Sequence, residues 1–128
     1  MSKLSSFPVT AALPAQDLGR LRKFYEGLGF PIEREDGEEG VSFRAGNTTF
    51  YVFRSMGRPS GDHTQMNFEV KNLDEVMAEM RDSGVTFETY DMPDFKTDAN
   101  GVLTMPNGEK AAWFKDPEGN VIALGEGM

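Results

Sequence analysis

The sequence predicts an α+β fold built from two copies of a βαβββ module. Two amphipathic helical segments occur, and each has a capping residue before it and a glycine after it. Asn72 follows Asp17 by 55 positions, and Gly84 follows Gly29 by the same 55 positions. Extended segments and turn residues flank both helices. A constant offset of this kind indicates an internal repeat.

The first module is expected over about residues 8–56 of a single 1–128 domain. An extended segment at 8–13 precedes a helix that Asp17 caps through its carboxylate. Apolar side chains recur at helical spacing until Gly29 ends the run. These side chains are Leu18, Leu21, Phe24, Tyr25 and Leu28. Segments with strand character and turn signals follow at 30–34, 41–44 and 48–54.

The second module is expected over about residues 63–126, after a short polar linker at 57–62. Asn72 caps its helix, and Glu75 occupies the capping-box position. The apolar stripe of this helix consists of Leu73, Val76, Met77 and Met80. Strands are expected at 85–90, 111–115 and 121–124. The segment 91–110 is long for a hairpin loop, so it either folds over a site or is a surface excursion.

The segment 63–70 shows strict two-residue alternation, which is typical of a strand. Its apolar face consists of Thr64, Met66, Phe68 and Val70, and we expect this face to pack on a helix. Its polar face consists of His63, Gln65, Asn67 and Glu69. A polar strand face in a two-layer domain either meets solvent or lines a cleft.

The composition limits the classes of function. The 21 acidic and 13 basic residues give a net charge of −8, which disfavours nucleic acid as a partner. The chain has no cysteine, so disulfides and thiolate chemistry are excluded. The first residues contain no long apolar run, so we expect no membrane span and a cytoplasmic location.

Three motifs together resemble the vicinal oxygen chelate superfamily, which includes glyoxalases, dioxygenases and bleomycin-resistance proteins. The segment 17–30 resembles the first helix of that family, 68–85 resembles the start of its second module, and 113–120 resembles its late hairpin. The resemblance covers nearly the whole chain. It implies that two curled mixed sheets surround a cleft, and that the chain assembles as a homodimer.

The same resemblance places the family's metal ligands at residues that are poor ligands in this chain. The first-strand position falls on Thr10, its repeat partner on Gln65, and the last-strand position on Ala123. No Asp or Glu occurs in 40–61, where the remaining ligand is expected, and the chain has one His. A catalytic divalent ion needs about three His or carboxylate ligands. We therefore expect neither a metal nor another cofactor.

Two functions follow from the resemblance. The chain is either a metal-independent protein that binds or sequesters an aromatic or cationic small molecule, or an enzyme of the lyase, isomerase or dioxygenase kind with an atypical metal or acid–base site. The residues expected to line the cleft are Thr10, Tyr51, Phe53, Gln65, Asn67, Glu69 and Trp113. Each has a structural alternative, because strand aromatics commonly pack in a core and rim charges commonly meet solvent. His63 is a candidate general base or an exposed linker residue.

Overall fold

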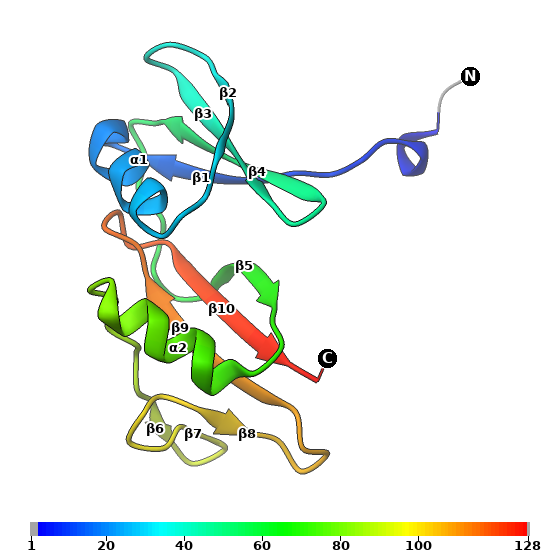
Figure 1. Ribbon diagram of the computed structural model, residues 1–128, viewed down its shortest axis with the longest axis vertical. Coiled ribbons are helices and arrows are strands. Elements are labelled where there is room, and N and C mark those ends of the chain that lie inside the picture. The colour runs from blue at the N-terminus through cyan, green and yellow to red at the C-terminus, as the bar shows by residue number, and fades with distance from the viewer. Residues whose placement is uncertain (1–2, 128) are drawn as a thin grey trace. The chain divides into compact units, whose positions relative to one another are not determined.

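The computed structural model describes residues 3–127 and divides the chain into two compact units, the first ending at Gly57 and the second beginning at Arg58 (Figure 1). Each unit contains a four-stranded sheet and a ten-residue α-helix. The predicted α+β class is therefore confirmed. Within residues 3–127, no helix is long and apolar enough to cross a membrane.

The first unit has one helix packed on one face of a mixed sheet (Figure 1). The sheet order is β1-β4-β3-β2, with β1 parallel to β4 and the other pairs antiparallel. Tyr25 is buried in the core, and its ring contacts those of Phe43 and Phe50. In chain order the elements are η1 (Leu4–Ser6), β1 (Ala11–Ala15), α1 (Leu18–Gly27), β2 (Ile32–Glu35), β3 (Gly40–Ala45) and β4 (Thr48–Arg54).

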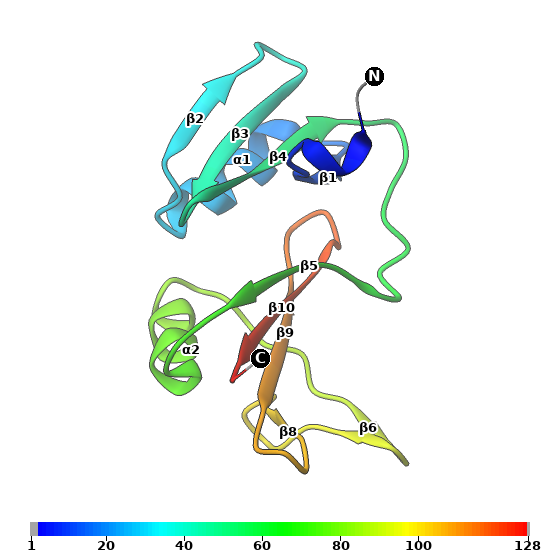
Figure 2. The same cartoon turned by 90° about the vertical axis from the view of Figure 1, so that its right-hand side faces the viewer.

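The second unit repeats this plan and adds a small hairpin. Its four-stranded sheet has the order β5-β10-β9-β8 (Figure 2), and β6 and β7 form a two-stranded sheet of their own (Figure 1). The elements are β5 (Thr64–Glu69), α2 (Leu73–Asp82), β6 (Asp91–Met92), β7 (Phe95–Lys96), β8 (Leu103–Thr104), β9 (Lys110–Lys115) and β10 (Val121–Glu126).

Both helices begin and end as the sequence predicts. The Asp17 carboxylate accepts a hydrogen bond from the backbone N–H three residues on (3.1 Å), and the Asn72 side chain does the same (3.3 Å). Gly29 and Gly84 each adopt a φ of 96°, which suits glycine at a helix end. The capping box differs in one detail, because the Glu75 carboxylate accepts from the Asn72 side-chain amide (2.8 Å).

Strand pairing shows the repeat at the level of single residues. In the first unit Leu13 pairs with Val52, and in the second Phe68 pairs with Leu124. Equivalent residues of the two units are 55 positions apart on the first strands, β1 and β5, and 72 positions apart on the last strands, β4 and β10. The neighbouring pairs on these strands keep the same two offsets, which supports the predicted duplication.

The prediction of a strand at 85–90 is wrong. Only an isolated bridge from Phe87 to Phe114 occurs there, and the fourth place in the sheet is taken by β8, inside the segment expected to be a loop. Val85 and Phe87 are buried, while Thr86 between them is exposed. This alternation of burial is typical of a strand, although the backbone forms a β-bridge at one residue only.

Candidate ligand-binding site

The face of the first sheet that points away from α1 carries several of the predicted site residues. Along β4, Phe50 and Val52 are buried, whereas Thr49, Tyr51 and Phe53 alternate with them and are half-buried. The strand's two-residue period therefore directs Tyr51 and Phe53 to the open face.

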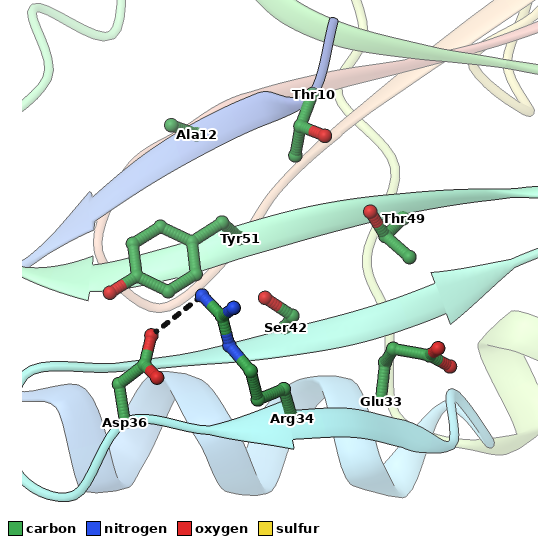
Figure 3. A pocket seen from close by; sticks show the side chains of 8 residues that line it. All are labelled: Thr10, Ala12, Glu33, Arg34, Asp36, Ser42, Thr49 and Tyr51. Atoms are coloured by element: carbon green, nitrogen blue, oxygen red, sulfur yellow. Dashed lines mark hydrogen bonds and ion pairs between the residues drawn. The ribbon is translucent and has the colours of Figure 1, made fainter. Parts of the chain in front are cut away.

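This open face holds a hollow with a volume of about 720 Å³ (Figure 3). It spans the whole sheet, because Ala12, Tyr51, Ser42 and Arg34 are neighbours in register across β1, β4, β3 and β2. The hollow is lined by Thr10, Ala12, Glu33, Arg34, Asp36, Ser42, Thr49 and Tyr51. The predicted residues Thr10 and Tyr51 thus share one hollow.

Tyr51 is fixed on three sides. Its ring stacks on Phe53, with centroids 6.1 Å apart and planes 9° apart. The ring also lies so close to Gly40 that any side chain there would overlap it and would have to displace the ring. Partial burial, followed by the charge and hydrogen bond of Asp36, raises the pKa of the Tyr51 hydroxyl. Tyr51 is therefore a neutral hydrogen-bonding group at neutral pH.

The charged side chains of the hollow are paired. Arg34 Nη2 lies 3.2 Å from Asp36 Oδ2, as the dashed line in Figure 3 shows. The guanidinium of Arg44 donates to both carboxylate oxygens of Glu33, at 2.7 and 2.8 Å. That pairing lowers the pKa of Glu33, so its carboxylate is ionised at neutral pH and is poorly suited to act as a proton acceptor.

In the second unit a β-bulge changes the predicted strand faces. The pairing of β10 with β5 shifts between Val121 and Ile122, so that Thr64 and Met66 are partners of consecutive residues. Thr64 then accepts a hydrogen bond from Trp113 Nε1 (3.1 Å). The expectation that Thr64 faces the helix is wrong, because a bulge inserts an extra residue and interrupts the alternation.

The other predicted residues of β5 lie in different environments. Asn67 and Glu69 are exposed. Gln65 is half-buried, and its Oε1 is buried without a hydrogen-bond partner among the described residues. Ala123 lies between Asn67 and Trp113 in register, so these two side chains occupy the same sheet face. The place of Gln65, Asn67 and Glu69 in a binding site remains a prediction.

Trp113 belongs to an aromatic cluster that includes Tyr90 and Phe95. The Trp113 centroid lies 5.8 Å from that of Tyr90 and 5.0 Å from that of Phe95. Burial, followed by the charge of Glu88, raises the pKa of Tyr90. Sequence reasoning did not assign Tyr90 or Phe95 to a site. The feature of the sequence that could have indicated these residues is the unusual length of the 91–110 segment, which contains Met92 and Phe95.

The family's usual metal does not fit the residues at its expected ligand positions. Ala123 has no ligand atom, and Thr10 and Gln65 offer neutral oxygens, which are weak ligands for a catalytic divalent ion. The strand β4 carries no Asp or Glu. Within residues 3–127, no group of three His, Asp or Glu side chains is placed to hold an ion.

Comparison with known proteins identifies the fold. The family model of the Glyoxalase/Bleomycin resistance protein/Dioxygenase superfamily matches residues 8–124. Lactoylglutathione lyase from Agrobacterium tumefaciens is 20% identical over 95% of this chain and 94% of that chain, with a TM-score of 0.70. A glyoxalase family protein from Enterococcus faecalis is 23% identical over 91% and 94%, with a TM-score of 0.69. A bleomycin-binding protein in complex with bleomycin is 18% identical over 95% and 99%, with a TM-score of 0.65. No curated protein sequence matches the chain.

Proposed function

Because the chain belongs to the Glyoxalase/Bleomycin resistance protein/Dioxygenase superfamily, we propose that it binds an aromatic or cationic small molecule without a divalent metal. The observation that carries this proposal is the hollow of the first unit. It combines an aromatic surface with hydroxyl groups, and the family's metal positions offer no suitable ligand set.

The hollow supplies the two kinds of contact that small-molecule sites usually combine. The Tyr51 ring, which lines the hollow and stacks on Phe53 beside it, gives a flat apolar surface at which an aromatic ring can stack. The hydroxyls of Thr10, Ser42 and Thr49 can donate to or accept from the polar edge of a ligand.

Charge favours a neutral or cationic ligand over an anion. The net charge of the chain is −8, which attracts cations over long distances. The Arg34 guanidinium, which lines the hollow, is paired with the carboxylate of Asp36, and the lining residue Glu33 is paired with Arg44. Gln65, Asn67, Glu69 and Trp113 remain our proposed contributions from the second unit.

A protein of similar fold binds bleomycin, so binding can be tested with bleomycin that has been prepared free of metal. We expect bleomycin to raise the melting temperature in the presence of chelator, because a ligand of the folded state stabilises it. In calorimetric titrations Tyr51→Ala should weaken binding by about tenfold or more through loss of the ring. Tyr51→Phe, the matched control, keeps the ring and should stay within about threefold.

Two outcomes would contradict the proposal. Stabilisation by a panel of aromatic amines and bleomycin that appears only when nickel, zinc, iron or manganese is added would favour a metal enzyme. Equal binding by the Tyr51→Ala variant and the unchanged protein would remove the hollow from the site.

We further propose that the protein is a homodimer whose N-terminal arm, residues 3–9, packs on the second copy. The arm exposes three large apolar side chains to solvent: 88% for Leu4, 58% for Phe7 and 93% for Val9. It extends away from the sheet of its own unit (Figure 1). Exposed apolar groups gathered on one segment are typical of an interaction surface.

A further inference from the structure

A second pocket, of about 400 Å³, lies in the second unit beside the β6–β7 hairpin. We propose that this pocket is a binding site for an aromatic ring that bears an alkylammonium group. None of the residues that line the hollow of the first unit lines this pocket, but the pocket includes Trp113, which we proposed above as a contribution from the second unit. The proposal therefore rests on the function proposed above and specifies the chemical class of the ligand and where in the second unit it binds.

The wall of the pocket is aromatic. Tyr90, Phe95 and Trp113 form a mutually contacting group with centroids 5.0 to 5.8 Å apart, and all three rings remain partly exposed. Val121 is 4% exposed and Met92 is 50% exposed, and both also line the pocket. Partly exposed apolar surface around a concave space is suited to taking up a flat ring.

Hydrogen bonds hold this wall in place before any ligand arrives. Trp113 Nε1 donates to Thr64 Oγ1 (3.1 Å), which fixes the orientation of the indole. The buried Thr97 hydroxyl accepts from the backbone N–H of Tyr90 (2.8 Å) and so ties the end of the hairpin to that residue. Groups that are already ordered lose less entropy when a ligand binds.

The polar edge of the pocket favours a hydrogen-bond donor with a positive charge. Asp62 contributes a carboxylate. His63 Nδ1 lies 3.2 Å from the Thr64 carbonyl oxygen, which only accepts, so Nδ1 carries the hydrogen and Nε2 of the neutral ring is an acceptor. The nearby cation of Lys115 is paired with Glu88 at 4.0 Å, which offsets its repulsion of an ammonium group.

The test uses three compounds that share a ring and differ in charge, namely phenethylamine, 2-phenylethanol and phenylacetate. None absorbs where tryptophan is excited, so the emission of Trp113, the single tryptophan, reports binding directly. We expect phenethylamine to change that emission with a Kd of about 1 mM or tighter. Phenylacetate should bind about fivefold more weakly at low salt, because its charge is repelled by Asp62.

Matched variants separate the charge from the ring. Asp62→Asn should abolish the preference for phenethylamine over phenylacetate, whereas Asp82→Asn, an exposed charge at the end of α2, should keep it. Phe95→Leu should weaken the binding of all three compounds by a similar factor. Unchanged Trp113 emission with phenethylamine, or equal affinity for the cation and the carboxylate in the unchanged protein, would overturn the proposal. The bleomycin titration with Tyr51→Ala tests the first hollow separately.

Discussion

The backbone N–H of Leu73 donates to the carboxylate of Glu126 at 2.6 Å, so the last residue of β10 supports the first turn of α2. A carboxylate at this end also interacts favourably with the helix dipole. We expect Glu126→Ala to lower the free energy of unfolding by about 1–2 kcal/mol, which urea denaturation can measure. Glu79→Ala, on the exposed face of the same helix, is the control. Equal loss in both variants would argue against a capping role.

Tyr51 gives a prediction about pH. Its pKa is raised above the usual value near 10 by burial and by Asp36. Because the unfolded chain then ionises first, the stabilisation is present below the usual tyrosine pKa and is lost as pH rises through the raised one. We expect Asp36→Asn to move one tyrosinate absorbance transition to lower pH. Asp74→Asn, on α2, should leave the titration unchanged, and a shift in both variants would contradict this assignment.

Single residues differ in how far the sequence predicts their roles. The caps at Asp17 and Asn72 were predictable because their hydrogen bonds reach only three positions along the chain. The hydrogen bond between Leu73 and Glu126 joins residues 53 positions apart, and no local sequence pattern predicts it. The Trp113–Thr64 hydrogen bond depends on a bulge in the pairing of β5, and the regular two-residue alternation of the β5 sequence gives no sign of that bulge.

At the scale of elements, the two helix-ending glycines offer a matched pair. Gly29 and Gly84 share a φ of 96°, and a side chain at either would meet open space, so only backbone strain opposes substitution. Gly29→Ala and Gly84→Ala should each cost about 1–2 kcal/mol. Gly27→Ala, inside α1 and also in open space, should be neutral or stabilise by up to about 1 kcal/mol. Thermal or urea unfolding distinguishes these outcomes, and a stabilised Gly84→Ala would contradict the argument.

Helices and strands were predicted well where the hydrophobic pattern of the sequence agrees with the strand pairing in the structure. The strand at 48–54 matches β4, because its alternation reflects one face on α1 and one face open. The predicted strand at 85–90 has the same alternation of burial without the ladder. The loop at 91–110 contains β6, β7 and β8, three two-residue strands whose pairing partners are set by tertiary contacts.

For the whole molecule, the proposed dimer is the property to measure. Burying the Leu4 and Phe7 side chains at two symmetric contacts should contribute several kcal/mol. The variant with Leu4→Ser and Phe7→Ser should therefore weaken self-association by about 100-fold or more in analytical ultracentrifugation. Met56→Ser, at a residue that is 96% exposed outside the arm, should not. A monomer at all micromolar concentrations would contradict the proposal.

The two register offsets show where the two copies of the module differ in length. The offset is 55 positions through both helices and 72 at the last strands, so the second copy holds 17 more residues. The offset is already 71 positions between β3 and β9, so nearly all of the addition lies between Gly84 and Lys110. Lengthening a surface connection costs little closure entropy. The two copies thus differ almost only in the length of this connection, and the longer one carries a hairpin whose residues can change without disturbing the four-stranded ladder.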